Sequence, residues 1–555
     1  MSKFWYLLVL GALIGLGCAR IAATYGHFWQ TWDEPAHIAA GIQWWEQGRI
    51  THERLHPPVA RIAMSAGPYF AGVRGTPGAP DHWTDGNSLL HQQGLYERNL
   101  TLARLGILPF FVIASLVVAA WTRRCAGEIP ALVAVFLFGL LPPILAHGGL
   151  ASLDMACAAF VVAALYALVV WTEKPVGSNA AMFGFFAALA ATSKFSAIAF
   201  LAAGSAAVVL ACFVACRGHT ASSPALTPRG VLQSLVPAFG VFFLTVWAVY
   251  RFSFGTVTDG GAGAELDAVL ASFGPLSPVA RTAAQSLPLP ALDFLWGLFD
   301  VVYFRRDEGH LATFFGEVGK DGWWLFYPVL LAVKTPLAFL LLAAVGGYAA
   351  LKARVVTGAW PALAALFGAF AILCAGIFFT PHNGLRQILA VYPLLAVLAA
   401  FGATRLWRAV WRPGLSKAVV LALVASCAFS SFAAHPDYLP YFNVLARVEP
   451  GTIAADSDLD WGQDLKRLAE TCRRRNIDQL HLRYNGSKGI DLSTFPLPEI
   501  VELKPDMRPD GWLAISRQSL LLGTGLPPYD QFSWLAKERP VEEVGSSILL
   551  YKLEP

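Results

Sequence analysis

The sequence has few charged residues and lacks the short motifs of nucleotide chemistry. Of its 555 residues only 14% are charged, 56% are hydrophobic, and the mean hydropathy is +0.53. Soluble domains carry roughly 25% charged residues, so the composition excludes a soluble globular protein and indicates a polytopic membrane protein. The net charge of +4 is spread over many loops and does not suggest nucleic-acid binding. The absence of HExxH, a Walker loop and a GxGxxG before a helix argues against a nucleotide-hydrolysing transporter and a Rossmann nucleotide-sugar enzyme.

The cysteines also form no functional pattern. The chain has eight of them, scattered and mostly within apolar runs, with no CxxC pair. Buried free cysteine behaves as a small hydrophobic residue. We therefore expect core packing, and neither a disulfide framework nor a zinc site.

Apolar runs predict eleven membrane spans. The first run is about 20 residues long, enough to cross a bilayer, and no A-x-A cleavage site follows it, so we expect a retained helix instead of a signal peptide. The fifth run is too short for a full upright span of about 20 residues. The expected spans are 4–23, 103–121, 129–147, 152–171, 180–193, 195–216, 231–250, 324–350, 358–379, 385–404 and 417–434.

Basic residues gather in alternate loops, which predicts the orientation of these spans. With a cytoplasmic N-terminus, the residues on the inner side are Lys3, Arg123, Arg124, Lys174, Arg217, Arg229, Lys352, Arg354, Arg405, Arg408, Arg412 and Lys417. The opposite orientation would place every one of these groups outside. We therefore expect Asp33, His56, Asp154, His382 and the C-terminal tail on the outer side, which is the periplasm if the chain lies in a bacterial inner membrane.

Three outer segments are too long to be simple connections. Residues 24–100 contain Trp44-Trp45 and a Pro-Pro break, which suggest amphipathic helices at the interface. Residues 251–322 form a large outer loop that ends at an aromatic anchor, Gly322-Trp323-Trp324. We divide the chain into a membrane module, 1–434, and a small soluble α/β domain, 435–555. In that domain we expect strands at 452–455, 479–484, 512–516 and 547–551 and a helix at 460–475.

A pair of acids, Asp33-Glu34, follows the first span directly. Asp and Glu commonly cap helix N-termini, and Pro35 suits a first helical turn, so Glu34 is the expected cap. Capping leaves Asp33 less well explained. A functional Asp33 would be a general base that takes a proton from an acceptor hydroxyl or amine.

Further candidates stand at span ends on the same predicted face. Asp154 begins the fourth span, where an ionisable group is either a cap or a functional residue. Arg104, Lys194 and Arg386 also lie at span ends, where Arg and Lys either hold a phosphate or snorkel toward head groups. Three basic groups and two acids on one face favour a site. His56, in His56-Pro57-Pro58, either orients a substrate or is an ordinary loop residue.

In combination these motifs resemble the C-type (GT-C) glycosyltransferases, in particular the bacterial polyprenyl-phosphate-sugar-dependent enzymes related to protein O-mannosyltransferases and lipid A aminoarabinose transferases. The resemblance covers most of the chain. The matching stretches are Thr31–His37 (TWDEPAH), Leu55–Ala60 (LHPPVA), Ala103–Leu105, Leu153–Met155, Ser193–Phe195, Gly309–Gly316, Gly322–Pro336 (GWWLFYPVLLAVKTP), Leu385–Pro393 (LRQILAVYP) and Asp456–Leu465 (DSDLDWGQDL).

The resemblance implies a GT-C fold and an inverting transferase. Its donor would be a sugar on polyprenyl phosphate, used on the periplasmic side, and its acceptor a protein, lipid or polysaccharide. Asp33 and Glu34 are then the catalytic acids, with Asp33 as general base. The substrate-binding residues would be His56, Arg104, Asp154, Lys194, His382 and Arg386. The role of Gln387, where many relatives have His or Tyr, stays open.

No metal is demanded by such a scheme, although Asp33 and Asp154 leave room for a divalent cation through oxygen ligands. Three other functions remain open. A secondary transporter is one, although the chain shows no two similar halves and its charges cluster at one surface. A polymerase or ligase of lipid-linked glycans is the second, and a scaffold that uses the C-terminal domain is the third.

Overall fold

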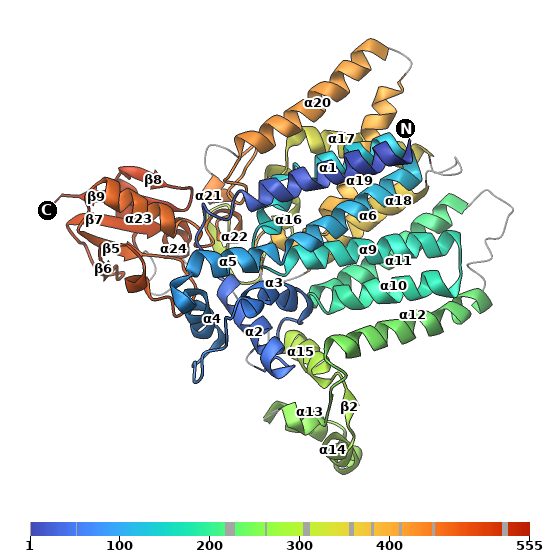
Figure 1. Cartoon of the computed structure of the whole chain (residues 1–555), viewed down its shortest axis with the longest axis horizontal. Helices are drawn as coiled ribbons and strands as arrows, with labels where there is room; N and C mark the ends of the chain where they lie inside the picture. The colour runs from blue at the N-terminus through green and yellow to red at the C-terminus, as the bar shows by residue number, and fades with distance from the viewer. Residues whose placement is uncertain are drawn as a thin grey trace.

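A bundle of long apolar helices makes up most of the molecule (Figure 1). The computed structural model describes residues 2–51, 53–216, 228–260, 264–303, 311–353, 360–378, 382–409, 413–446, 450–523 and 531–554. The bundle consists of α1 (Lys3–Ala22), α6 (Leu108–Ala126), α7 (Glu128–Phe138), α8 (Pro142–Gly148), α9 (Asp154–Glu173), α10 (Gly177–Ala191), α11 (Ser196–Cys216), α12 (Pro228–Val249), α16 (Phe326–Val333), α17 (Leu337–Lys352), α18 (Trp360–Ile377), α19 (Val391–Trp407) and α20 (Pro413–Ala433).

Seven helices in the described ranges are long and apolar enough to cross a membrane, or up to nine if two bent pairs each count as one span. The bent pairs are α7 with α8, at 69°, and α16 with α17, at 115°. Two shorter apolar helices, α10 and α19, account for the remaining expected spans. The polytopic helical class is confirmed, whereas the number eleven and the orientation stay predictions.

Small residues let these helices approach closely. Gly346 on α17 faces the carbonyl of Leu398 on α19, and Gly402 on α19 faces the carbonyl of Leu342 on α17. A Cβ at either glycine would collide with backbone that cannot move aside. Small residues at helix contacts are the usual means of tight packing in lipid.

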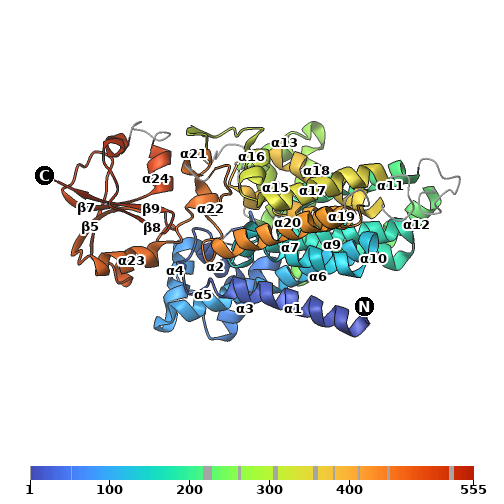
Figure 2. The same ribbon diagram turned by 90° about the horizontal axis from the view of Figure 1, so that it is seen from above.

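The first long segment between spans folds as four helices at one end of the bundle. They are α2 (Glu34–Gln47), α3 (Val59–Phe70), α4 (His82–His91) and α5 (Tyr96–Leu105). Both views place α4 and α5 between the bundle and the C-terminal sheet (Figures 1 and 2). Helices are therefore present in 24–100, and their position at the membrane interface stays a prediction.

In the second long segment, α13, α14 and β2 project from the bundle (Figure 1). The elements of this segment are β1 (Phe254–Gly255), α13 (Ala264–Ala271), α14 (Ser277–Ser286), β2 (Leu289–Pro290), α15 (Leu292–Tyr303), β3 (Ala312–Phe314) and β4 (Glu317–Gly319). Strands β1 and β2 pair antiparallel, as do β3 and β4. Residues 309–310 of the matched stretch 309–316 lie outside the described residues.

The C-terminal region ends in a mixed five-stranded sheet of order β6-β5-β7-β9-β8. The strands are β5 (Gln479–Arg483), β6 (Glu499–Glu502), β7 (Gly511–Ser516), β8 (Glu542–Val544) and β9 (Ile548–Leu553), with helices α23 (Leu465–Arg474) and α24 (Arg517–Leu522). Three expected strands are confirmed as β5, β7 and β9. The short polar strands β6 and β8 were not expected, because each lies at an edge and buries little apolar surface.

Two predictions for the C-terminal region are wrong. The strand expected at 452–455 is absent, because α21 (Pro450–Ile453) leads into a turn whose Ala455 N–H donates to Thr313 Oγ1 (3.2 Å). The helix expected from Asp460 begins only at Leu465, since the preceding stretch forms the single turn α22 (Asp456–Leu459) and a loop. That stretch packs on the bundle: one apolar cluster extends from the spans through Trp461 to the sheet.

Candidate active site

The acidic pair lies at the N-terminus of α2, but its two members have different surroundings. Asp33 is the N-cap residue and its side chain makes no capping hydrogen bond. Glu34 is the first helical residue and is fully buried. Its carboxylate accepts hydrogen bonds from the Thr31 amide (2.7 Å) and the Ala151 amide (2.8 Å). The prediction that Glu34 is the cap is therefore wrong by one residue.

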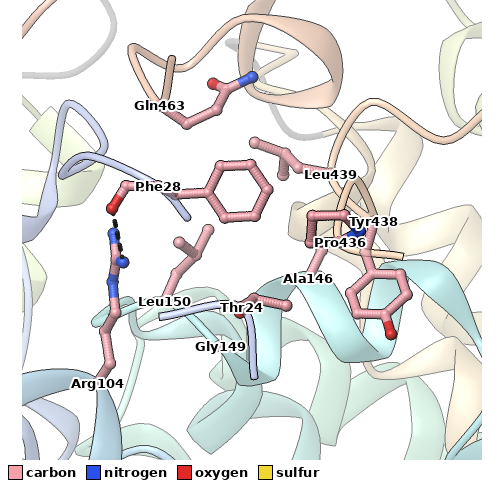
Figure 3. A pocket seen from close by; sticks show the side chains of 10 residues that line it. All are labelled: Thr24, Phe28, Arg104, Ala146, Gly149, Leu150, Pro436, Tyr438, Leu439 and Gln463. Carbon is pink, nitrogen blue, oxygen red and sulfur yellow. Dashed lines mark hydrogen bonds between the residues drawn. The ribbon is translucent and has the colours of Figure 1, made fainter. Parts of the chain in front are cut away.

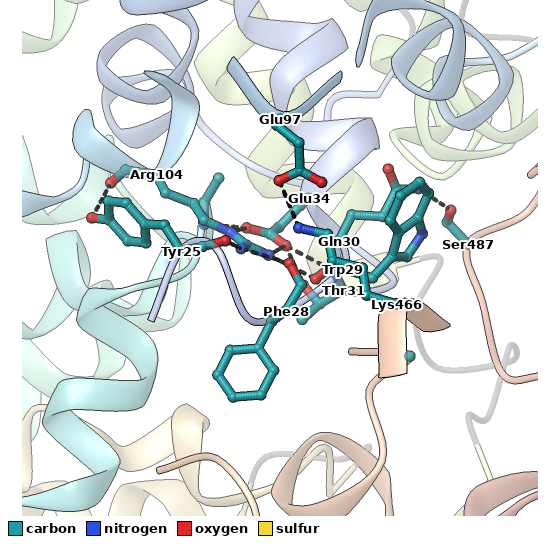
Figure 4. Close-up of polar contacts among 12 residues, drawn as sticks. Tyr25, Phe28, Trp29, Gln30, Thr31, Glu34, Glu97, Arg104, Lys466 and Ser487 are labelled. Carbon is teal, nitrogen blue, oxygen red and sulfur yellow. Dashed lines mark hydrogen bonds and ion pairs between the residues drawn. The ribbon is translucent and has the colours of Figure 1, made fainter. Parts of the chain in front are cut away.

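Glu34 forms a two-pronged ion pair with Arg104 (Figure 4). Arg104 Nε donates to Glu34 Oε1 (2.9 Å) and Nη2 donates to Oε2 (2.8 Å). The other N–H groups of Arg104 point at backbone carbonyls of Tyr25, Phe28 and Trp29. Burial by itself would raise the pKa of Glu34, but Arg104 and the amide donors outweigh burial and hold that pKa below its usual value.

The roles expected for Arg104 and Glu34 stay predictions, but the geometry shows no open donor or acceptor at either side chain. Arg104, expected to contact a donor phosphate, is 1% exposed and has all of its N–H directions occupied by protein oxygens. Glu34, expected to share the catalytic role, has no exposed oxygen to receive a proton from a substrate. Both residues therefore fix the loop 25–31 against the bundle.

A second group of charges lies close by and is partly open. Arg386, on the 3-10 turn η6 (Leu385–Ile388), places Nη1 3.0 Å from Asp33 Oδ2 and 4.0 Å from Asp154 Oδ2. Lys194, between α10 and α11, donates to Asp154 Oδ1 (2.6 Å) and to Gln387 Oε1 (2.9 Å). We call Asp33, Asp154, Lys194, Arg386 and Gln387 the charge cluster.

The charge cluster brings together four of the predicted site residues from segments far apart in the sequence. Asp154 is the first residue of α9 and is 2% exposed. The Asp33 side chain, by contrast, retains 26% of its exposure. Of the two carboxylates in the cluster, Asp33 is therefore the one that is partly exposed. Gln387, whose role the sequence left open, fixes the Lys194 ammonium.

The loop between α22 and α23 covers the charge cluster. The guanidinium carbon of Arg386 lies 4.2 Å from the centre of the Trp461 ring. Asp458 accepts from the Leu385 amide (3.1 and 3.2 Å), which holds η6 in place. The sequence alone assigns no role to this motif, because nothing local connects residues 456–464 with η6.

Two predicted histidines, His56 and His382, lie in aromatic contacts. The ring of His56 lies 5.4 Å from that of His37, one helical turn beyond Asp33 on α2. Burial, together with Arg61, lowers the pKa of His37 well below its usual value, which favours the neutral ring. His382 accepts from the Trp323 amide (3.0 Å) and stacks on Phe326, 4.8 Å between ring centres. The structure thus places the predicted His382 in an aromatic contact, while His37 was not predicted.

A small cavity is lined by Arg104, Phe28 and Tyr438, among other residues (Figure 3). Its volume is about 20 Å³. A single water needs roughly 10–15 Å³ measured in this way, so the cavity has no room for a sugar. We do not assign it to a substrate.

The described part of the chain contains no group of three or more His, Cys, Asp and Glu side chains that could hold a metal ion. Between Asp33 and Asp154 the positive charge comes instead from Arg386. The expected alternative of a divalent cation at these two acids is not tested by this geometry.

Comparisons with known proteins give matches among solved structures alone. No family profile matches the chain, and neither does any curated protein. The apo oligosaccharyltransferase of Archaeoglobus fulgidus aligns over 78% of this chain and 56% of its own, with 14% identity and a TM-score of 0.46. ArnT from Cupriavidus metallidurans in the apo state aligns over 99% and 98%, with 12% identity and a TM-score of 0.46.

Both neighbours are C-type glycosyltransferases. A further match is ArnT bound to undecaprenyl phosphate, with 12% identity and a TM-score of 0.45. This chain spans little more than half the length of the oligosaccharyltransferase and nearly all of ArnT. At such identities no residue role is carried from these structures to this chain.

Proposed function

We propose that the chain is an inverting glycosyltransferase that moves a sugar from a polyprenyl-phosphate donor to an acceptor hydroxyl or amine. The observation that carries the proposal is the charge cluster, in which one partly exposed carboxylate, Asp33, pairs with Arg386, while Lys194 pairs with the neighbouring Asp154. A base next to phosphate-binding cations is the arrangement that this reaction requires.

In the proposed reaction Asp33 accepts the proton of the acceptor group as its oxygen or nitrogen attacks the anomeric carbon. The bond from that carbon to the phosphate oxygen breaks on the opposite face, so the configuration inverts. The leaving phosphate gains negative charge, which Arg386 and Lys194 stabilise. A bound phosphate also competes with Asp33 for Arg386, and this competition frees the carboxylate to act as the base.

The partners of the proposed reaction are those that the sequence resemblance implies. The donor is a lipid, so the charge cluster should lie at the membrane surface, on the periplasmic side of a bacterial inner membrane with the N-terminus in the cytoplasm. The acceptor is a protein, lipid or polysaccharide group on that side. We assign 1–434 to the catalytic membrane module and 435–555 to a periplasmic domain whose loop 460–464 covers the cluster.

The decisive experiment measures donor turnover by the full chain in lipid vesicles. A panel of polyprenyl-phosphate sugars is offered with a membrane extract as acceptor source, and free polyprenyl phosphate is quantified. Because general bases contribute about 10²–10⁴-fold, Asp33→Asn should lower turnover by at least 100-fold while the protein still elutes as a folded species. Equal turnover in Asp33→Asn and wild type would refute the assigned base. No turnover of any donor by folded wild-type protein would refute the transferase.

The proposed reaction has no metal step, because Arg386 supplies positive charge between Asp33 and Asp154. Turnover should therefore be unchanged in EDTA. Loss of turnover in EDTA that added Mg²⁺ restores would show instead that a divalent cation serves the two acids.

A further inference from the structure

A polar pocket lies between two helix ends of the bundle. It has a volume of about 270 Å³, more than ten times that of the cavity near Arg104. Three arginines line it: Arg124 in the last turn of α6, Arg405 in the last turn of α19, and Arg408 just after α19. The rest of the lining is Cys125, Ala126, Gly127, Phe401 and Thr404. We call this site the arginine pocket.

The arginine pocket is remote from the charge cluster. Arg124 Nε donates to Glu173 (2.6 Å), the last residue of α9, whereas the first residue of α9 is Asp154 in the cluster. A helix of twenty residues, at a rise of 1.5 Å per residue, is about 30 Å long and separates the two sites by that length. The arginine pocket therefore takes no part in the proposed transfer.

The charge of the pocket is not balanced by protein groups. Arg124 has Glu173 as its partner, and the neighbouring Arg123, outside the pocket, has Glu128. Across the described ranges, no carboxylate lies within 4 Å of Arg405 or Arg408. The Arg405 guanidinium lies instead over the Phe401 ring, 4.8 Å from its centre. The charges of Arg405 and Arg408 therefore have no acidic partner in the described residues and are available to a bound anion.

Snorkelling and the helix dipole explain basic residues at helix C-termini in general. Neither effect requires guanidinium groups from two separate helices to line one hollow, where they repel each other. Convergence of like charges is stabilised by an anion between them. Guanidinium groups pair with phosphate oxygens through two parallel N–H bonds, and a pocket of this volume is near the lower limit for small-molecule sites, about 300 Å³.

We propose that the arginine pocket binds a phosphate group, carried either by an anionic phospholipid or by a soluble anion. Basic pockets between spans on the cytoplasmic side commonly receive anionic head groups, and the sequence-based orientation places this end of the bundle on that side. The proposal does not depend on the function of the charge cluster.

The test uses the full chain in nanodiscs of phosphatidylcholine with increasing phosphatidylglycerol, and native mass spectrometry measures the lipid retained. The variant is Arg405→Gln/Arg408→Gln, and the matched control is Arg123→Gln, which removes a charge at the same end of the bundle outside the pocket. A basic residue near anionic lipid contributes about 1 kcal/mol, so the double variant should bind phosphatidylglycerol about 30-fold more weakly. The control should bind it like wild type.

A second arm separates the two sources of phosphate. In pure phosphatidylcholine discs, inorganic phosphate is added and the midpoint of thermal unfolding is followed. A rise in wild type that is absent from the double variant, with no retention of phosphatidylglycerol, assigns the pocket to a soluble anion. If the double variant does not fold, Arg408→Gln alone replaces it, because Arg408 lies exposed beyond α19. Equal lipid retention in all proteins, with no phosphate effect, overturns the proposal.

Discussion

Asp33 and Glu34 are neighbours in the chain, yet each forms a different kind of ion pair with an arginine. Glu34 is fully buried. Its carboxylate accepts two hydrogen bonds from Arg104 and a further one from the backbone amide of Ala151. Asp33 keeps about a quarter of its side-chain exposure and meets Arg386 through one contact. Chemical identity therefore does not decide which acid is available to a substrate. The number of protein donors that already occupy its oxygens decides it.

The largest expected effect is a loss of folding stability when Glu34 is replaced. Removing one partner of a buried ion pair costs about 3–5 kcal/mol, because the other charge is left buried and unpaired. Glu34→Gln should therefore lower the free energy of unfolding by about that amount. The midpoint of thermal unfolding of the detergent-solubilised protein measures it.

The control for Glu34→Gln is Glu97→Gln. Glu97 pairs with Lys466 at 2.6 Å (Figure 4), but its side chain is 60% exposed. Such surface pairs contribute about 0–1 kcal/mol, so Glu97→Gln should hardly change the midpoint. A Glu34→Gln protein as stable as the control would show that the buried pair does not hold the loop 25–31.

The next largest effect concerns the cations of the charge cluster. Lys194→Gln removes the ammonium that contacts Asp154, and loss of one stabilising donor at a reacting oxyanion costs about 10²–10³-fold in rate. Turnover should fall within that range, and Lys194→Arg should recover part of it. Turnover of Lys194→Gln equal to wild type would limit Lys194 to a structural pairing with Asp154.

How far the sequence predicts these two regions depends on how local the contacts are. Spans of about 20 apolar residues such as α9, and strands such as β7 and β9, follow from hydrophobic patterning and were predicted. That Asp33, Asp154, Lys194 and Arg386 share one end of the bundle followed from the alternation of basic loops.

Partner choice was not predictable in the same way. Arg104 and Arg386 both lie near span ends. No local pattern in the sequence shows that Arg104 pairs with the buried Glu34 whereas Arg386 pairs with the partly exposed Asp33. The cover supplied by Trp461 comes from a contact across 75 positions of the chain, which a single sequence does not reveal. The missed strands β6 and β8 are edge strands with weak apolar patterning.

The folding stability contributed by the buried acids Glu34 and Asp460 should depend on pH with opposite signs. Arg104 holds the pKa of Glu34 below its usual value, so the stability from Glu34 is present at neutral pH and is lost as the pH falls through that lowered value. No salt bridge to Asp460 is present within the described residues, and burial raises its pKa to about 7. Stability from protonated Asp460 is full below its ordinary pKa of 3.8 and is lost as the pH rises to about 7.

The measurement is stability against pH for wild type and Asp460→Asn. Each pH unit within the window changes the free energy by about 1.4 kcal/mol, so wild type should lose about 2 kcal/mol between pH 4.5 and pH 6 relative to the variant. Parallel curves for the two proteins would mean that Asp460 is ionised in the folded state.

The smallest expected effect tests whether the C-terminal loop acts on the charge cluster through its ring. Trp461 lies over Arg386 at 4.2 Å, and its backbone carbonyl accepts from the Trp32 amide (3.0 Å), next to Asp33. A desolvated cation–π contact contributes about 1–2 kcal/mol. Trp461→Leu keeps the backbone bond and loses the ring, so binding of polyprenyl phosphate should weaken about tenfold. Trp461→Phe retains an aromatic face and should recover most of that binding. If the Phe and Leu variants weaken binding equally, the position of Arg386 depends on the native indole and not on an aromatic face in general. If neither variant weakens binding, the loop covers the charge cluster without orienting Arg386.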